Sequence, residues 1–188
     1  VAPAAHALVF QFIQMGGILL GALGMSTQTM VPNAMSIGSG ESTPGSGLSP
    51  SDALVRRLFK WGLVLGLGIG SLQLLFLPNI LRSSPLLEVR EAARIPALIA
   101  ITFQGINGII NVGEGILMGT GNFSWLSINI VLAALCYASA LKFLSGPFGL
   151  TGVWMSLAVF TVVRLAGVLA NPLIRQKTGI WSDARRVQ

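Results

Sequence analysis

Several stretches of this chain carry no charged residue over a length that lets a helix cross a membrane. Among them are residues 61–81, 115–141 and 143–163. A helix of about 20 mostly apolar residues spans the hydrocarbon layer of a bilayer. Of the 188 residues, 10% are charged, whereas soluble domains carry about 25%. The sequence therefore predicts an all-α, polytopic membrane helix bundle with the lipid bilayer as its surroundings.

The hydrophobic pattern predicts about five transmembrane helices. Their expected ranges are 4–30, 61–81, 95–121, 123–144 and 149–173. We divide the chain into a first transmembrane helix (1–35), a flexible Gly/Ser/Pro loop with a basic amphipathic segment (36–60), a four-helix remainder (61–174) and a basic tail (175–188). Pro32-Asn33 is expected to end the first helix, and Pro96 to lie in the first turn of the third. The turn before the fifth helix is expected at Ser145-Gly146-Pro147.

Glycines at helical spacing predict where helices approach one another. The first span contains Gly16, Gly17, Gly21 and Gly24, and the second has Gly62, Gly66 and Gly70 at intervals of four. Small residues at such spacing let two membrane helices pack closely. We interpret these glycines as packing positions and not as a substrate site.

Lysine and arginine are distributed unevenly between the two ends of the predicted bundle. Seven lie at the end that holds the 36–60 segment and the tail, and four lie at the other end. The excess predicts a cytosolic tail and an outward N-terminus. Because this topology is awkward for five spans without a signal peptide, we expect at least one further span upstream. The net charge of +6 belongs to residues that border apolar runs, so no nucleic-acid partner is expected.

Glu114 is the one carboxylate placed deep inside an apolar run. It is the last of four polar residues spaced by three, four and three positions, after Gln104, Asn107 and Asn111. On a helix this spacing forms one polar stripe. A charge at the centre of a membrane helix costs roughly 2.5–3.5 kcal/mol and is a functional hypothesis by default. We predict a cation- or proton-coupling site at Glu114, Asn111 and Asn107.

Arg164 lies in the middle of the predicted fifth span, and Glu114 is the only carboxylate within the predicted spans with which it could pair. It either pairs with that carboxylate or serves packing and backbone carbonyls. Gln104, Gln28 near the exit of the first span and His6 at its entrance are further candidates for substrate contact. A Na⁺ ion at Glu114 is the one metal ion considered, and no cofactor is expected.

Several motifs resemble the multidrug and toxic compound extrusion (MATE) family. They are Ala4-Ala5-His6, Gln28, Lys60-Trp61-Gly62 with Gly66, Gly113-Glu114-Gly115-Ile116-Leu117 and Gly119-Thr120-Gly121-Asn122. The ending Gly149-Leu150-Thr151-Gly152-Val153-Trp154, Arg164 and Thr178-Gly179-Ile180-Trp181 is similar to the DinF-like branch, which includes plant plastid members.

The resemblance implies a twelve-span antiporter with two lobes, of which this chain is a fragment covering spans eight to twelve of the C-terminal lobe. It implies that Glu114 matches the acidic residue of span ten, which takes part in H⁺ or Na⁺ coupling. The N-terminal lobe and a small organic substrate would be its partners. The chain would belong to an integral multi-pass membrane protein, which would lie in the plastid envelope if the source is a photosynthetic eukaryote.

Two functions remain open from the sequence. The first is part of a secondary antiporter that exports small organic compounds in exchange for H⁺ or Na⁺. The second is a non-transporting scaffold or assembly subunit, or a truncated gene product, in which the polar stripe holds helices together. No HExxH, GxSxG, paired carboxylates or Cys/His cluster is present, so an enzyme is not expected.

Overall fold

Six helices make up nearly all of the described part of the computed structural model, which covers residues 1–38 and 50–178. They are α1 (Ala2–Gly38), α2 (Pro50–Ser83), α3 (Leu87–Thr102), α4 (Gln104–Gly119), α5 (Phe123–Ala170) and α6 (Pro172–Thr178). No strand occurs within the two described ranges. The prediction of an all-α bundle is therefore confirmed.

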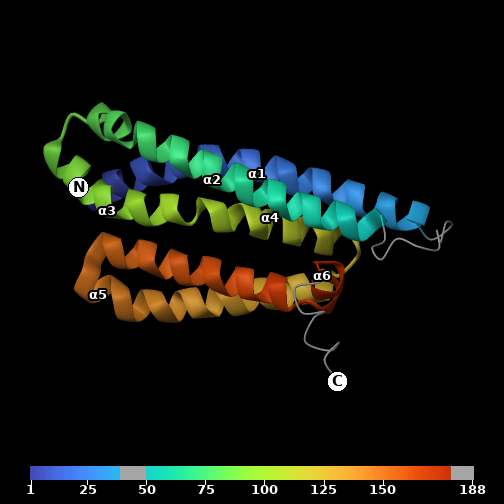
Figure 1. Cartoon of the computed structure of the whole chain (residues 1–188). Helices are drawn as coiled ribbons and strands as arrows, with labels where there is room; N and C mark the ends of the chain where they lie inside the picture. The colour runs from blue at the N-terminus through green and yellow to red at the C-terminus, as the bar shows by residue number, and fades with distance from the viewer. Residues whose placement is uncertain (39–49, 179–188) are drawn as a thin grey trace, which may run out of the picture.

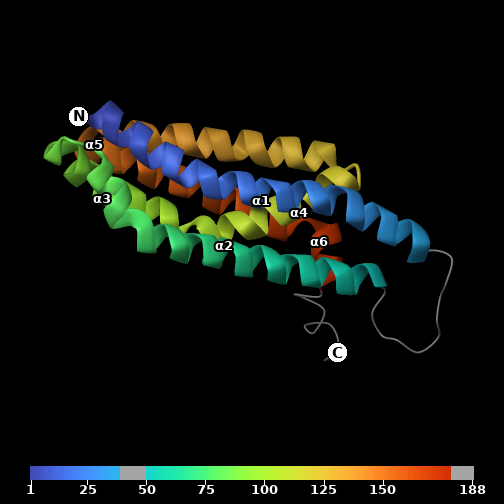
Figure 2. The same ribbon diagram turned by 90° about the horizontal axis from the view of Figure 1, so that it is seen from above.

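The middle of the bundle is α4. It packs against α1 and α2 on one side and against α5 on the other, as Figure 1 shows. Figure 2 shows the same helix in the space between α1 and α2. The polar stripe of the sequence therefore lies on a helix that contacts all three long helices, α1, α2 and α5.

The two ends of the bundle hold different parts of the chain. The N-terminus, the α2–α3 junction and the fold of α5 lie at one end, which we call the N-terminal end (Figures 1 and 2). The start of α2, the end of α4 and α6 lie at the other, which we call the C-terminal end. An apolar cluster packs at each end, one around Ala93 and Trp154 and the other around Val112 and Ile174.

Helix α5 is folded back on itself and forms two antiparallel arms. The indole N–H of Trp125 donates to the Gly167 carbonyl at 2.9 Å, and Asn129 Nδ2 donates to the Arg164 carbonyl at 3.1 Å. The chain reverses at Gly149, where φ is 53° and ψ is −128°. The turn predicted at Ser145-Gly146-Pro147 is thus wrong by a few residues, because the helix continues to the one residue whose backbone reverses the chain.

Gly149→Ala is expected to lower the free energy of unfolding by about 1–3 kcal/mol, because a side chain is strained at this positive φ. No atom lies within 4 Å of a Cβ at Gly149, so the loss comes from the backbone alone. Gly146→Ala is the matched control, since Gly146 is helical and equally open. It is expected to gain about 0.5–1 kcal/mol. Chemical unfolding in detergent measures both, and equal effects of the two changes would contradict the assignment of Gly149.

The number of segments that can cross a membrane depends on whether the two arms of α5 are counted separately. Within residues 1–38 and 50–178, three helices, α1, α2 and α5, are long and apolar enough to cross a membrane, and the pair α3–α4 makes a fourth candidate. The 48 residues of α5 would reach about 72 Å as a straight helix, more than twice the hydrocarbon thickness. With its two arms counted separately, five apolar segments lie side by side, as the sequence predicts.

The end predicted for the first helix is wrong. Residues of α1 continue beyond Pro32 to Gly38. Proline lacks the N–H that would bond to the carbonyl four residues back, which here belongs to Gln28. The Gln28 carbonyl, which lacks this hydrogen bond, packs against Gly119 at the end of α4. The helix continues through Pro32 without a break.

The third predicted span is bent and begins earlier than expected. Its two parts, α3 and α4, meet at Phe103 with an angle of 46°. The N–H of Phe103 bonds to Ala100, three residues back, at 3.2 Å, which tightens the last turn of α3. Pro96 lies inside α3 and not in its first turn, because the amphipathic residues from Leu87 onward already form helix with Val89 and Ala93 buried.

The loop and tail predicted at 36–60 and 175–188 are partly helical. Residues 50–60 belong to α2, with Pro50 in the first turn, where its missing N–H costs little. At the other boundary, α6 continues to Thr178 and begins at the cap Asn171, whose Oδ1 accepts the Leu173 N–H at 3.0 Å. The remainder of both predicted segments, 39–49 and 179–188, lies outside the described residues.

Candidate functional site

Small residues bring α4 close enough to its neighbours to enclose its polar stripe. Gly62 of α2 and Gly108 of α4 face each other so closely that a Cβ on either would overlap the backbone of the other. On α1, Gly24 similarly faces the Asn111 carbonyl. Within the described residues, no atom of another helix lies within 4 Å of a Cβ at Gly17 or Gly21, so the structure shows no close helix approach at these two predicted packing positions.

Gln104, at the start of α4, lies in a buried amide network. Its Nε2 donates to Gln73 Oε1 at 3.1 Å and to the Ile13 carbonyl at 3.3 Å. Asn107 Nδ2 donates to Gln104 Oε1 at 3.2 Å. The Gln104 side chain is thus occupied by α1, α2 and its own helix, and 1% of the residue is exposed. This geometry gives it a structural position and not an open substrate contact.

Gln104→Leu is expected to lower the free energy of unfolding by about 1–2 kcal/mol, the upper range for hydrogen bonds between membrane helices. The change leaves the amides of Gln73 and Asn107 without their shared partner. Gln11→Leu on the exposed surface of α1 is the control and is expected to be nearly neutral. Unfolding in detergent compares the two variants, and a neutral Gln104→Leu would show that the network adds nothing to stability.

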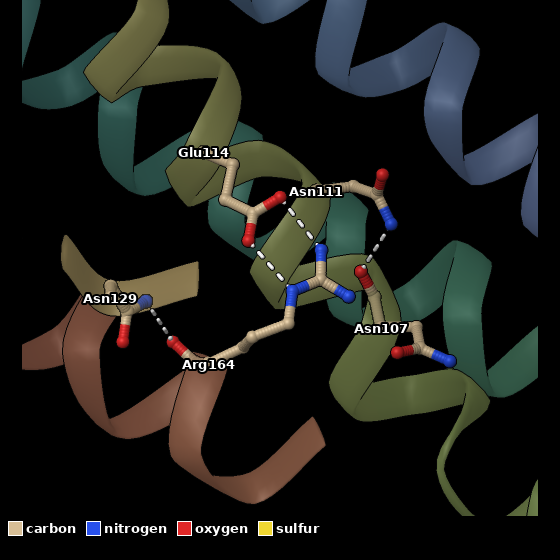
Figure 3. A network of polar contacts seen from close by, with 5 residues as sticks. All are labelled: Asn107, Asn111, Glu114, Asn129 and Arg164. Carbon is tan, nitrogen blue, oxygen red and sulfur yellow. Dashed lines mark hydrogen bonds and ion pairs between the residues drawn. The ribbon is translucent and has the colours of Figure 1, made fainter. Parts of the chain in front are cut away.

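Glu114 and Arg164 form a bidentate ion pair between α4 and the second arm of α5. Arg164 Nε donates to Glu114 Oε1 at 2.9 Å, and Nη2 donates to Oε2 at 2.7 Å (Figure 3). Such parallel bonds between a guanidinium and a carboxylate are strong and directional. The side chains are 22% and 12% exposed for Arg164 and Glu114, respectively. Of the two alternatives predicted for Arg164, the structure shows the ion pair.

Neighbouring groups hold this pair in place. The guanidinium lies over the Phe160 ring, 5.3 Å from its centroid. Asn129, on the first arm of α5, holds the backbone of Arg164 through the 3.1 Å bond to its carbonyl (Figure 3). Asn111 Nδ2 donates to the Asn107 carbonyl at 2.8 Å, and Asn111 Oδ1 has no hydrogen bond within the described part of the chain. The site therefore offers one neutral oxygen ligand next to a carboxylate.

Two cavities flank the ion pair. One, of about 180 Å³, is lined by Glu114, Asn111 and Gln28 together with Gly21, Gly24, Met25, Gly115 and Met118. The other, of about 250 Å³, has Arg164, Asn107 and Thr161 in its wall, with several aromatic rings. Glu114 lines the first cavity and Arg164 lines the second, so each member of the pair borders a different cavity. Because both Glu114 oxygens accept from Arg164, a cation that binds this carboxylate from the first cavity would compete with the guanidinium.

Of the other predicted site residues, Gln28 is near Glu114 and His6 is not. Gln28 lines the same cavity as Glu114. His6 lies at the N-terminal end, where its ring centroid is 6.0 Å from Phe10 and 5.5 Å from Trp154. Phe10 and Trp154 line the larger cavity together with Arg164, whereas His6 lines neither cavity and packs against these two rings.

Gln73 and Asn129 belong to the polar framework although the sequence analysis gives them no role. Each is a buried amide on an otherwise apolar helix, and such residues in membrane helices usually bond to a neighbouring helix. A single amide on an otherwise apolar helix is therefore the sequence signal from which the roles of Gln73 and Asn129 could have been predicted. No group of three His, Cys, Asp or Glu side chains that could hold a metal ion occurs within the described ranges.

Apolar helices of spanning length around an internal ion pair define a multi-pass integral membrane protein. Protein DETOXIFICATION 42 of Arabidopsis thaliana is 30% identical over 82 residues, which are 44% of this chain and 16% of that protein. Protein DETOXIFICATION 43 of the same plant is 26% identical over 136 residues, 71% of this chain and 25% of that protein. The chain thus matches a quarter or less of the length of these relatives. No family model and no solved structure matches it.

These similarities, weak and partial in coverage, support the MATE family that the sequence resembles.

Proposed function

We propose that this chain forms part of a secondary antiporter that exports small organic compounds in exchange for H⁺ or Na⁺. The observation that carries the proposal is the Glu114–Arg164 pair, whose two members line different cavities in a bundle of apolar helices. The name shared by the two relatives, DETOXIFICATION, agrees with export of small compounds. The motifs near the C-terminus favour the DinF-like branch of the MATE family.

The coupling step proposed here is a competition for the carboxylate. Arg164 occupies both oxygens of Glu114, so binding of H⁺ or Na⁺ from the smaller cavity has to displace the guanidinium. Asn111, which lines that cavity, would supply a second oxygen to Na⁺, and Asn107, which lines the other cavity, would stabilise the freed guanidinium. A ligand changes a conformational equilibrium only through a difference in affinity for the two states. If Arg164 releases Glu114 in one of the two states, the carboxylate binds H⁺ or Na⁺ with a different affinity in each state.

Transport also needs a second lobe against which this one moves. We infer that the N-terminal lobe of the same transporter is that partner, as the resemblance implies. The alternative of a membrane scaffold rests on the same ion pair, which would then lock α4 to α5 without ever opening. The antiporter and the scaffold differ in whether the Glu114–Arg164 ion pair breaks: it breaks during each transport cycle in the first and stays intact in the second.

The test is counter-ion-driven uptake of substrate into vesicles that contain the complete transporter. Glu114→Gln keeps the size of the side chain and removes its charge, and it is expected to reduce uptake to the level of vesicles without protein. Glu91→Gln is the control, because Glu91 is exposed near the start of α3 and is expected to leave uptake unchanged. Full uptake with Glu114→Gln would remove this carboxylate from the mechanism and favour the scaffold.

A further inference from the structure

A basic groove lies along the first turns of α2, at the C-terminal end of the bundle. It has a volume of about 930 Å³ and is lined by Leu54, Arg56, Arg57, Lys60, Trp61 and Val64, among others. We call these six residues the α2 groove. None of them belongs to the ion-pair site or to its two cavities.

The groove residues share one side of α2 because of their spacing. Arg56 and Lys60 are four positions apart, as are Arg57 and Trp61, and residues at this interval lie above one another on a helix. Val55, Leu58 and Gly62 lie on the opposite side and are buried. The groove cations therefore lie on the side of α2 opposite to the residues that it buries in the bundle.

The positive charge of the groove has no acidic counterpart among the described residues. Asp52, the nearest acid in the sequence, is 2.9 Å from Lys177 of α6. Glu114 is paired with Arg164, and Glu88 and Glu91 lie on α3 at the N-terminal end. Arg56 Nε is buried without a hydrogen-bond acceptor in the part of the chain that the structure describes. An oxyanion in the groove would supply that acceptor.

Below the cations the surface is apolar and open. Trp61 is 53% exposed, Val64 is 56% exposed and Leu67, one turn further along α2, is 55% exposed. Tryptophan and basic residues at the end of an apolar helix mark the headgroup region of a membrane. A ligand that fits both parts has an anionic head and a hydrocarbon tail.

We propose that the α2 groove binds an anionic phospholipid, with the headgroup phosphate at Arg56, Arg57 and Lys60 and an acyl chain along Trp61 and Val64. Clusters of basic residues next to a membrane helix attract anionic lipids, each residue contributing to the attraction. The lipid would hold the start of α2 at the membrane surface. This inference does not depend on what the protein transports.

The experiment uses the purified protein in phosphatidylcholine vesicles that contain a small fraction of brominated phosphatidylglycerol, which quenches nearby tryptophan. The share of Trp61 is the difference between the protein and its Trp61→Phe variant. We expect brominated phosphatidylglycerol to quench Trp61 more strongly than the same fraction of brominated phosphatidylcholine. Lys60→Gln is expected to lower this preference about fivefold, which corresponds to about 1 kcal/mol per cation near a membrane surface. The triple change Arg56→Gln, Arg57→Gln, Lys60→Gln is expected to abolish it.

The control removes three exposed cations from the N-terminal end, Arg82, Arg94 and Lys142, by changes to glutamine. It is expected to leave the preference unchanged. Equal loss in this control would show a general attraction to charge, and an unchanged preference in the triple variant would show that the groove is not the site. Either result overturns the proposal, as does displacement of the lipid by soluble glycerol phosphate. Lys60 is exposed, so its single variant gives an answer even if the triple variant does not fold.

Discussion

Arg164→Gln is expected to lower the free energy of unfolding by about 3 kcal/mol, at the lower end of the range for breaking a buried ion pair. The change leaves the Glu114 carboxylate, whose side chain is 12% exposed, without the guanidinium that fills both its oxygens. Joint replacement by Glu114→Gln and Arg164→Gln is expected to restore most of the loss, because two neutral amides at this distance bury no unpaired charge. The four proteins of this cycle are compared by unfolding in detergent.

The same cycle distinguishes an ion pair that only locks two helices from one that couples transport. If the pair is only a lock, the double variant is stable and transports as the unchanged protein does. If Glu114 couples transport to H⁺ or Na⁺, the double variant is stable and does not respond to the counter-ion. Equal stability of all four proteins would contradict the view that the pair bridges α4 and α5 in the folded state.

Composition and helical spacing predicted the helical class and the five apolar segments, because burial in a bilayer leaves few alternatives to helices. The exact ends were less predictable. Pro32 does not end α1, since the carbonyl that it leaves unbonded packs against Gly119 of α4. The sequence did not predict the bend at Phe103. The bend occurs next to the Gln104–Gln73 hydrogen bond, which joins residues 31 positions apart. Such contacts are set by the tertiary structure and leave no local signal.

The candidate site was predictable where a single helix carries it. Gln104, Asn107, Asn111 and Glu114 lie on α4 as their spacing requires. Depth in the membrane indicated Arg164 as the available partner but left its role open, since spacing says nothing about which helices are neighbours. His6 was a candidate for substrate contact because it lies at the entrance of the first predicted span, and the fold places it beside Trp154. The coupling role of Glu114, Asn111 and Asn107 stays a prediction.

Gly62→Leu is expected to be the most damaging change to the packing of the bundle. A Cβ at Gly62 would lie 2.7 Å from the Gly108 carbonyl oxygen and 2.9 Å from Val112, and the rest of a leucine has no space between the two backbones. Backbone atoms cannot move aside as a flexible side chain can, so α2 and α4 have to separate. Overpacking of this kind typically costs about 1–3 kcal/mol and occasionally more, and we expect a value at or above the top of that range.

Separation of α2 from α4 would also reach the polar network, since Gln73 of α2 bonds to Gln104 of α4. The damage should therefore appear both as lower unfolding free energy and as faster amide exchange along the start of α4. Gly68→Leu is the matched control on the same helix, because no atom lies within 4 Å of a Cβ there. It is expected to be neutral or slightly stabilising, as leucine is a better helix former than glycine by about 0.8 kcal/mol. If the two variants were equally stable, close contact at Gly62 would not be what holds α2 against α4, and the enclosure of the Glu114 stripe would need another cause.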